Sequence, residues 1–594
     1  MPSIKILPEI LRNQIAAGEV VERPASALKE LLENAVDAEA TEIEIFLEDG
    51  GIKKIELRDN GQGMSREDAI LSVKRHATSK ISKKEDLFNI QTLGFRGEAL
   101  ASIASVSIFT LETKQEKGIS GTKIEIHAGY ELETQDCACQ KGTRVIVEDL
   151  FENIPARKKF LKTQNTELKN CLQVVENVAF VHPEINIKLF HNGKEIFKCL
   201  AENKNERVEN IIGKELFSKL IPVQESLDFI HIKGFVSKPG EAFKTRNNQK
   251  IFVNGRSVKD STVMASVNDA YHSFLERGAY PAFYLFITIS PDLVDVNVHP
   301  QKSEIRFMRG QEVFQVVKNT ILKAFNSIGN SLGHSSEIGD SKYLKLSQNV
   351  SKYESFSSNR KSFHSAIPSF KNPSKSQVSV ALNFSKTILE SKSSSFDFKD
   401  EDELQGYKII GQAAKKFIIL EKDEKIIFLD QHAVHERARY DEFMNILKNK
   451  ESKSQRLLFP EIINCNSQEF LSIQEHINFF QNIGFEIEEF GNNTFQINSV
   501  PQQISEENLK ETILKTAEEL GEKGESKESE KNIEKALTYL ACRGSVMFGD
   551  ELNKDELKSI VKKWINSAKG LTCPHGRSLG FEMSVKELEK KVGR

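Results

Sequence analysis

The chain has 594 residues, which predicts several domains, because a single hydrophobic core stops growing at about 250–300 residues. Hydrophobic residues make up 39% of it and charged residues 28%, a composition that excludes a wholly disordered or membrane-embedded protein. The net charge of −3 excludes a global basic excess, so any nucleic-acid surface must be local. Seven scattered cysteines exclude a disulfide framework, and no apolar run reaches the roughly 18 residues of a membrane span. We therefore expect a cytoplasmic protein that makes no membrane contact.

A helix is predicted over residues 27–38, with polar and apolar residues on opposite sides. At 100° per residue, Glu30, Asn34 and Asp37 fall within about a 60° arc. A carboxylate and an amide one turn apart suit a water-activating base and a magnesium ligand. For this pattern alone, an ordinary solvated face is the simpler interpretation. The other side is apolar and would pack on a sheet: Leu31, Leu32, Ala35 and Val36.

Two alternating strands follow, and the second of them ends at Asp59 in a glycine turn, Asn60-Gly61-Gln62-Gly63. A carboxylate there could accept a hydrogen bond from a purine amino group. Glycine turns are usually only turns, but here an ordered series of them indicates a nucleotide site without a Walker loop. Three more segments continue the series: His76-Ala77-Thr78-Ser79-Lys80, Gly94-Phe95-Arg96-Gly97 and Gly142-Thr143.

Dense apolar periodicity continues to about residue 332, and basic residues gather in one stretch of it. Contacts between basic side chains and DNA phosphates give affinity without sequence specificity and weaken with salt. A solvated charge run is the alternative. The candidate DNA-binding residues are Lys244, Arg246, Lys250, Arg256 and Lys259.

Residues 333–403 are rich in Ser, Lys and Asn. Such a tract cannot bury enough apolar surface to offset its chain entropy, so it is predicted to be a disordered linker. Its r.m.s. span, on the order of 45 Å, would let the ordered parts on either side meet.

The C-terminal part combines side chains that bind divalent metals. An apolar strand ends at Asp430, and His432 and Glu436 lie four residues apart, on one face of the helix predicted to follow. Together with downstream residues they provide carboxylate, imidazole and thiolate ligands, which suit Zn²⁺ or Mn²⁺ and the activation of water. The alternative is that Asp430 caps a helix and the cysteines are small core residues. The downstream candidate ligands are Cys542, Cys573 and His575.

Residues 456–540 separate these ligands and predict an inserted subdomain. At its start, the segment 455–460 resembles the peptide by which nucleases and polymerases dock on the replication sliding clamp. Its candidate contact residues are Gln455, Leu458 and Pro460. An ordinary buried loop between subdomains is the alternative.

Several of these motifs resemble one ATPase superfamily, which comprises gyrase, Hsp90, histidine kinases and MutL proteins. The motifs that carry this resemblance are Glu30–Ala38, Asp59–Gly63 and Gly94–Leu100. Three others are similar specifically to the MutL family of DNA mismatch repair proteins: Asn13–Val20, His76–Lys80 and Asp295–Lys302. The C-terminal metal motifs extend the resemblance over residues 404–594, so that only the linker lies outside it.

The resemblance implies a role for each part of the ATP site. Glu30 would be the general base, Asn34 the magnesium ligand, and Asp59 would bind adenine. Gly94–Gly97 would line a mobile lid, and Lys302 would reach the γ-phosphate from the second domain. The positions implied to contact ATP besides Asn34 and Asp59 are Asp37, Gly61, Gly63, Thr78, Ser79, Lys80, Gly94, Phe95, Arg96, Gly97, Thr143 and Lys302.

The resemblance also implies an α/β multidomain architecture. An α/β sandwich ATPase domain (residues 1–215) would precede a ribosomal-protein-S5-like domain (216–332), the linker and an α/β C-terminal dimerisation domain (404–594). ATP would bring together the two N-terminal domains of a homodimer and close a clamp around double-stranded DNA. The implied protein partners are a MutS-type mismatch recognition protein and the replication sliding clamp.

Some members of the family nick DNA, whereas others only relay a signal. The C-terminal motifs are similar to those of the nicking branch, which implies an endonuclease. One departure is Asp441, followed by Glu442, where that branch has a second glutamate. The alternative is a non-nicking ATPase matchmaker whose cluster holds a structural zinc. Mixed carboxylate, imidazole and thiolate ligands favour the endonuclease, because structural zinc is held mostly by Cys and His.

Overall fold

The computed structural model divides the chain into two compact units. The first comprises Met1–Leu332, Ser452–Gln502 and Glu506–Lys523, and the second comprises Gly333–Glu451, Gln503–Ser505 and Gly524–Arg594. Within the described ranges, no helix combines the length and apolarity required to cross a membrane. The structure describes residues 21–80, 94, 97–243, 245–276, 278–295, 305–331, 404–449, 452–491, 493–506, 508–521, 526–546, 549–566 and 572–592.

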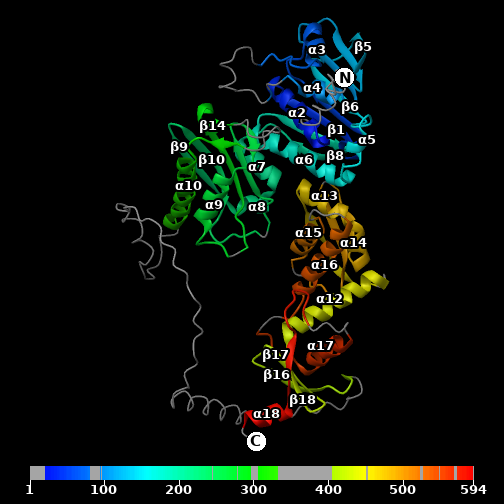
Figure 1. The fold of residues 1–594 in the computed structure, drawn as a ribbon, viewed down its shortest axis with the longest axis vertical. Coiled ribbons are helices and arrows are strands. Elements are labelled where there is room, and N and C mark those ends of the chain that lie inside the picture. Colours follow the sequence, from blue (N-terminus) through cyan, green and yellow to red (C-terminus); the bar gives the residue numbers. More distant parts are fainter. Residues whose placement is uncertain are drawn as a thin grey trace, which may run out of the picture. The chain divides into compact units, whose positions relative to one another are not determined.

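An eight-stranded sheet forms the N-terminal part of the first unit (Figure 1). Only β1 and β7 pair in parallel, and all other neighbouring strands are antiparallel. In sheet order the strands are β5 (Tyr130–Cys137), β4 (Gly121–His127), β3 (Ile108–Lys114), β6 (Gly142–Glu148), β2 (Lys54–Asp59), β1 (Glu42–Glu48), β7 (Asn186–His191) and β8 (Lys194–Cys199). The predicted alternation is confirmed in β1, where Ile43, Ile45 and Leu47 are buried and the residues between them are more exposed.

Helices cover the buried face of this sheet, and α2 (Pro24–Asp37) confirms the helix predicted over residues 27–38. It begins three residues earlier than predicted because Pro24 fits the first helical turn, where no N–H partner is required. Leu28, Leu31 and Leu32 are at most 2% exposed, so the apolar side packs inward as predicted. The other helices of this part are α3 (Arg66–Ser72), α4 (Ala99–Ala104), α5 (Pro155–Lys158), α6 (Gln164–Val181), α7 (Lys204–Ile212) and α8 (Lys214–Ser218), with a 3₁₀ turn, η1, at Asp49–Gly51.

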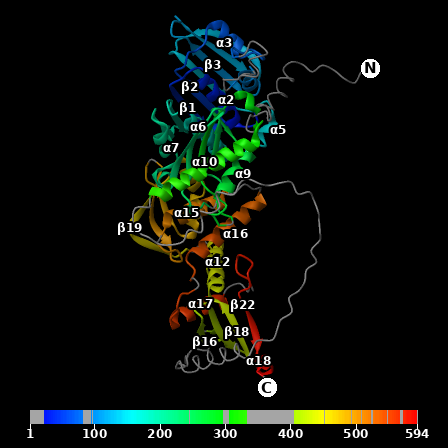
Figure 2. The same cartoon turned by 90° about the vertical axis from the view of Figure 1, so that its left-hand side faces the viewer.

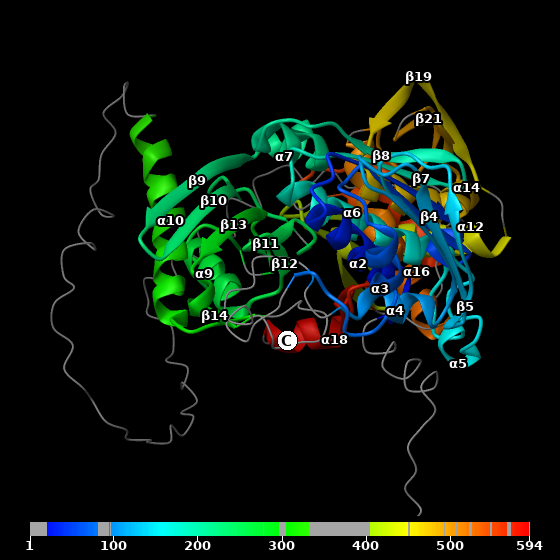
Figure 3. The ribbon, with the colours of Figure 1, turned by 90° about the horizontal axis from the view of Figure 1, so that it is seen from above.

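A second sheet of five strands follows, and two helices cover one side of it (Figure 3). Its apolar core joins the sheet to α9 (Ser261–Tyr271) and α10 (Gly310–Ser331). In sheet order the strands are β12 (Arg256–Val258), β11 (Gln249–Val253), β13 (Phe283–Ile289), β10 (Ile230–Ser237) and β9 (Leu220–Leu227). A short ladder of β14 (Val294–Asp295) and β15 (Arg306–Phe307) lies beyond the 3₁₀ turn η3 (Pro291–Leu293). This is the second α/β domain that the sequence predicted.

The first unit also contains a three-stranded sheet from the segment predicted to be an insertion. Its order is β19 (Ser454–Asn464), β21 (Thr494–Pro501) and β20 (Glu486–Glu489). Three helices accompany it: α13 (Ser467–Glu475), α14 (Ile477–Ile483) and α15 (Leu509–Leu520).

The second unit is built on a four-stranded sheet of order β16 (Lys408–Ala413), β17 (Phe417–Lys422), β18 (Lys425–Asp430) and β22 (Gly580–Ser584) (Figure 2). Its core joins this sheet to α12 (Gln431–Asn449) and α17 (Lys554–Asn566). Two more helices belong to the unit, α16 (Ser526–Arg543) and α18 (Val585–Lys591). The direct step from β18 into α12 places Asp430 at the start of the helix that carries His432 and Glu436.

Candidate functional site

The polar side of α2 forms the centre of the candidate nucleotide site. Lys80 donates from Nζ to Asn34 Oδ1 at 3.1 Å and to Asp37 Oδ2 at 2.5 Å. The backbone N–H of Gly94 donates to the same Asp37 oxygen at 3.0 Å. Four residues from three predicted motifs are therefore in direct contact, and Glu30 lies one turn away on the same side of the helix.

Gly94 leaves the space in which these side chains meet. A Cβ atom at this position would lie 3.1 Å from Lys80 Nζ, 3.6 Å from Asn34 Oδ1 and 3.7 Å from Asp37 Oδ2. Any larger residue would therefore fill the cradle that the amide, the carboxylate and the ammonium group surround. A side chain at this position would require Lys80 to shift by a few tenths of an ångström.

Asp59, at the end of β2, is a largely buried carboxyl group. Burial raises its pKa to about 6, while hydrogen bonds from the backbone N–H groups of Gly61 and Thr143 oppose that rise. The Gly61 bond is 2.9 Å long. A buried carboxyl group with this raised pKa retains an oxygen that can accept a hydrogen bond from a ligand amino group.

The packing of the chain itself requires glycine at two positions of the turn after Asp59. A Cβ atom on Gly63, where φ is 67°, would lie 2.1 Å from the Lys114 carbonyl oxygen, and one on Gly61 would lie 2.7 Å from the Ala38 carbonyl oxygen. These glycines therefore let the turn pack against β3 and the end of α2, which holds Asp59 in place.

The segment 76–80 and the segment after Gly94 also contact each other. The His76 N–H donates to the Gly97 carbonyl at 2.9 Å, and His76 Nδ1 lies 3.3 Å from Glu98 Oε1. Thr78 Oγ1 accepts from the Lys80 N–H at 3.2 Å, and Ser79 stands between these two residues. Thr143 Oγ1 lies 3.1 Å from Thr113 Oγ1. Phe95, Arg96, Lys302 and the motif at residues 13–20 lie outside the described residues.

Two of the five predicted DNA-binding residues are only partly exposed and interact with groups of the ATPase part. Lys250 donates to Asn177 Oδ1 of α6 at 3.2 Å, and burial lowers its pKa. Burial also lowers the pKa of Arg256, which is close to three carboxylates of α2, Glu33, Asp37 and Glu30. Both side chains are partly exposed, so a DNA contact by this pair stays a prediction.

The other candidates differ from this pair. Arg246 is exposed and lies over the Tyr280 ring, 4.6 Å from its centroid. Lys259 is also exposed, and Lys244 lies outside the described residues. A DNA contact by Arg246 and Lys259 stays a prediction.

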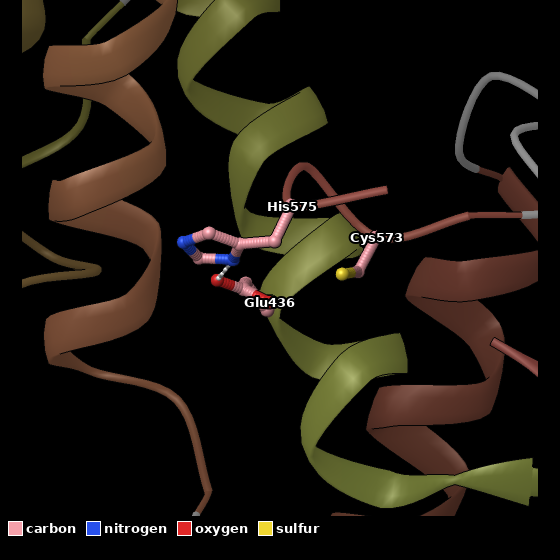
Figure 4. Close-up of side chains that lie close together, drawn as sticks. All are labelled: Glu436, Cys573 and His575. Atoms are coloured by element: carbon pink, nitrogen blue, oxygen red, sulfur yellow. Dashed lines mark ion pairs between the residues drawn. The ribbon is translucent and has the colours of Figure 1, made fainter. Parts of the chain in front are cut away.

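In the second unit, Glu436, Cys573 and His575 form the candidate metal centre (Figure 4). One ligand atom from each lies within 4.8 Å of the others, and His575 Nδ1 is 2.8 Å from Glu436 Oε1. Glu436 and Cys573 are 2% and 3% exposed, whereas the His575 side chain is 48% exposed. A buried carboxylate beside a thiol and an open imidazole is a donor set that suits a divalent transition metal.

The backbone explains this convergence. Glu436 lies in the second turn of α12, and a tight turn at residues 573–576 faces it. In that turn the Gly576 N–H donates to the Cys573 carbonyl at 2.8 Å, and Gly576 has a φ of 81°. The Cys573 N–H in turn donates to the Arg577 carbonyl at 2.8 Å. This turn brings both Cys573 and His575 to Glu436.

The other three predicted ligands do not join this group. Asp430 Oδ1 accepts from the Ala433 N–H at 3.0 Å, so it caps α12, as the simpler interpretation proposed. His432 Nδ1 lies 2.8 Å from the Val546 carbonyl oxygen. Cys542 belongs to α16 and lies near Arg439. Among the described residues, the candidate metal centre therefore contains three of the six predicted ligands.

Asp441, which stands where the nicking branch has a second glutamate, also lies outside the candidate metal centre. Asp441 is 8% exposed and is bound by Arg437 at 2.9 Å, and Glu442 lies 3.0 Å from Lys563. Burial lowers the pKa of the neighbouring His435 to about 4, and its Nδ1 accepts the Val546 N–H at 3.1 Å, so this ring is a packed part of the helix environment.

The segment resembling a clamp-docking peptide lies in β19, and the alternative of a buried loop is wrong. Leu458 and Phe459 are 86% and 80% exposed, and Pro460 is exposed too. Strand pairing with β21 is irregular between Arg456 and Glu461, so these side chains protrude where the ladder is interrupted. Gln455, at the start of the segment, donates to Glu506 at 3.2 Å.

Three family models match the chain. They describe a histidine kinase-, DNA gyrase B- and HSP90-like ATPase at residues 22–147, the C-terminal domain of a DNA mismatch repair protein at 208–326, and a MutL C-terminal dimerisation domain at 410–552. The chain is 34% identical to the DNA mismatch repair protein MutL of Geotalea daltonii over 604 residues, covering 100% of this chain and 99% of the relative. It is 35% identical to that of Bacillus anthracis over 641 residues, covering 100% of both. A solved structure, the Aquifex aeolicus MutL ATPase domain complexed with ADP, is 29% identical and covers 46% of this chain and 94% of its own, with a TM-score of 0.35.

Proposed function

Because the chain belongs to the MutL family of DNA mismatch repair proteins, we propose that it is an ATP-gated endonuclease that nicks DNA near a mismatch. Its N-terminal part is a histidine kinase-, gyrase B- and HSP90-like ATPase domain, and its C-terminal part is a MutL dimerisation domain. The nicking activity, the metal and the partners other than a second copy of the chain are the proposed part.

The observation that carries the ATPase assignment is the group of polar side chains around Gly94. The amide oxygen of Asn34 and the carboxylate of Asp37 already bind one cation, the ammonium group of Lys80, so their oxygens suit Mg²⁺. Bound Mg²⁺ would neutralise phosphate charge. Glu30 would orient and deprotonate the attacking water, and Asp59 would accept a hydrogen bond from the adenine amino group.

The proposed nicking site is the group of Glu436, Cys573 and His575. Three ligands from the chain leave positions for water and substrate, which is typical of catalytic rather than structural zinc sites. A metal bound there would supply an activated water. Glu436 would bind through its buried carboxylate, and the exposed His575 ring would stand on the side from which DNA can approach.

Asp430 and His432 remain candidates for the same site. Asp430 directly precedes α12 and His432 lies in its first turn, so both are one to two turns before Glu436. A metal that recruited them would have to compete with the helix cap and with the Val546 carbonyl. Those two contacts favour the second candidate function, a non-nicking ATPase matchmaker with a structural zinc.

A plasmid assay separates the two functions. Purified full-length protein is incubated with supercoiled plasmid and Mn²⁺, and relaxed circles are counted for the wild type, Asp430→Asn and Glu436→Gln. The endonuclease predicts nicking by the wild type and none by Glu436→Gln, with ATP hydrolysis intact in both. If the wild type leaves the plasmid supercoiled at every Mn²⁺ concentration, the matchmaker is the correct function.

We also propose a homodimer that binds double-stranded DNA and is directed by a MutS-type protein and a sliding clamp. The exposed Leu458 and Phe459 support the clamp contact, since apolar side chains that protrude from a strand suit a docking pocket on a partner. Changing Gln455 and Leu458 to Ala should remove stimulation by a loaded clamp and leave the basal Mn²⁺ activity. Stimulation that persists in this double variant would place the docking segment elsewhere.

A further inference from the structure

Two cysteines lie close together at one edge of the eight-stranded sheet. Cys137 is the last residue of β5 and Cys139 follows two residues later, and both thiols are free and partly exposed. The edge strand β5 pairs with β4 so that Cys137 lies opposite Gly121. A Cβ atom on Gly121 would lie 2.2 Å from Cys139 Sγ and 3.2 Å from Cys137 Sγ. Both sulfur atoms therefore border the small space that a side chain on residue 121 would fill.

The two thiols also interact with each other. Burial raises the pKa of Cys137 to about 11, and the hydrogen bond with Cys139 and the charge of that thiol act in the same direction. Glu112 and Lys123, which also act on Cys137, are held in ion pairs of their own. The geometry and the electrostatics therefore both describe a pair of coupled thiols.

Neighbouring thiols of this kind exchange with small disulfides. The exchange begins when a thiolate attacks a disulfide sulfur and forms a mixed disulfide. A second thiol close by resolves this intermediate efficiently, because its attack is intramolecular. Exposed disulfides are readily reduced again, which suits a transient, redox-sensing bond in a reducing compartment.

The segment after Cys139 leads directly to the candidate adenine site. Three residues separate Cys139 from Thr143, whose backbone N–H donates to the Asp59 carboxyl group. A Cβ atom on Gly142 would lie 2.0 Å from the Asp59 carbonyl oxygen, so the chain is tightly packed at this point. A displacement of Cys139 therefore acts, through a short segment, on a hydrogen bond that Asp59 accepts.

We propose that Cys137 and Cys139 form a redox-sensitive dithiol site that closes to a disulfide by exchange with a low-molecular-mass disulfide and thereby weakens nucleotide binding at Asp59. One cysteine attacks a sulfur of oxidised glutathione, whose S–S bond breaks and releases one glutathione. The other cysteine attacks the protein sulfur of the mixed disulfide and releases the second glutathione. The two protein thiols are oxidised to one disulfide, and their protons pass to the two reduced glutathione thiols. The link to nucleotide binding rests on the proposed adenine role of Asp59.

Trypsin leaves both thiols on one peptide, residues 124–141, which contains no other cysteine. Full-length protein is equilibrated with oxidised glutathione, its free thiols are alkylated, and the mass of this peptide is measured. The wild-type peptide should lose two hydrogen atoms and carry neither glutathione nor alkyl groups. Cys137→Ser and Cys139→Ser should each stop at the mixed disulfide and carry one glutathione. The matched control is Cys465→Ser, which removes another partly exposed thiol and should close as the wild type does. A wild-type peptide that carries two glutathiones, or that stays fully alkylated, would overturn the dithiol site.

A fluorescent ATP analogue titrated into the same proteins measures the link to the ATP site. Oxidation of the wild type should lower its affinity by about two- to tenfold, the size expected for one lost hydrogen bond, and a dithiol reductant should restore it. The double variant Cys137→Ser/Cys139→Ser should keep its affinity in oxidised glutathione. A disulfide that forms without a loss of affinity would overturn the link to Asp59. A reduced wild type that binds no ATP contradicts the proposed function instead.

Discussion

The candidate nucleotide site and the candidate metal centre both begin from a helix with functional residues spaced at one turn, yet they assemble differently. On α2, Asn34 and Asp37 share one partner, Lys80, and form one connected group. On α12, His432 and Glu436 have the same kind of spacing but different partners, since His432 contacts the Val546 carbonyl and Glu436 contacts His575. A shared helix face therefore does not establish a shared site, because the surrounding segments decide which side chains meet.

The largest effect is expected at the nucleotide site. Glu30→Ala should lower ATP hydrolysis by about 10²–10⁴-fold, because removal of a general base has an effect of this size. ATP should still bind, since Asn34, Asp37 and Asp59 are unchanged, and a fluorescent nucleotide titration measures this directly. Glu39→Ala is a matched control, because Glu39 is an exposed acid just beyond the same helix. Hydrolysis by Glu30→Ala at the control rate would show that another group is the base.

The metal centre should respond most strongly to loss of one of its three converging residues. Cys573→Ser should lower metal affinity by more than about 100-fold, since even loss of an outer partner of a ligand lowers it by about 10–100-fold. Metal content per chain, measured after dialysis against a chelator, gives the result. Asp441→Asn should retain the metal, because Asp441 is bound to Arg437 outside the cluster. If Asp441→Asn lost more metal than Cys573→Ser, Asp441 and not Cys573 would be the metal ligand.

The raised pKa of Asp59 predicts a pH-dependent stability. Its folded pKa of about 6 is above its ordinary value of 3.8, so the folded state binds this proton more tightly than the unfolded state does. The resulting stabilisation is complete below pH 3.8 and is lost as the pH rises through 6. Between pH 4 and pH 7, wild type should therefore lose about 2 kcal/mol relative to Asp59→Asn, which carries no such proton.

Denaturant unfolding of both chains at the two pH values measures this difference. The comparison within each pH removes the contributions of all other titrating groups. A difference that is the same at pH 4 and pH 7 would show that the Asp59 carboxyl group is better hydrated than its burial indicates. ATP binding by Asp59→Asn, measured alongside, tests the separate adenine role.

The smallest effect separates the two interpretations of Asp430. As a helix cap, Asp430 should be replaceable by Asn with little change, whereas Asp430→Ala should lower stability by about 1 kcal/mol. If Asp430 is a metal ligand, both variants should lose bound metal and nicking activity. Stability and metal content measured on the same two proteins therefore distinguish a cap from a ligand. An Asp430→Asn variant that is stable and still nicks would remove Asp430 from the catalytic residues.

The sequence by itself determined the elements and the chemistry that their residues can perform. Apolar periodicity identified α2 and the alternating β1, because side-chain direction follows from the local backbone period. It also indicated the polar side of α2, because the helical period alone places three residues on one face. The carboxylate, thiol and imidazole of the C-terminal motifs were recognised for the same reason: residue type defines the ligands that are available.

Only the tertiary structure decided which of these side chains meet. Lys80 reaches α2, and Cys573 and His575 reach Glu436. Each of these contacts joins segments far apart in the chain, and its geometry depends on how sheets and helices pack. Burial also shifts the pKa of a group, as it does at Asp59, and burial is a property of the folded chain that spacing in the sequence does not contain.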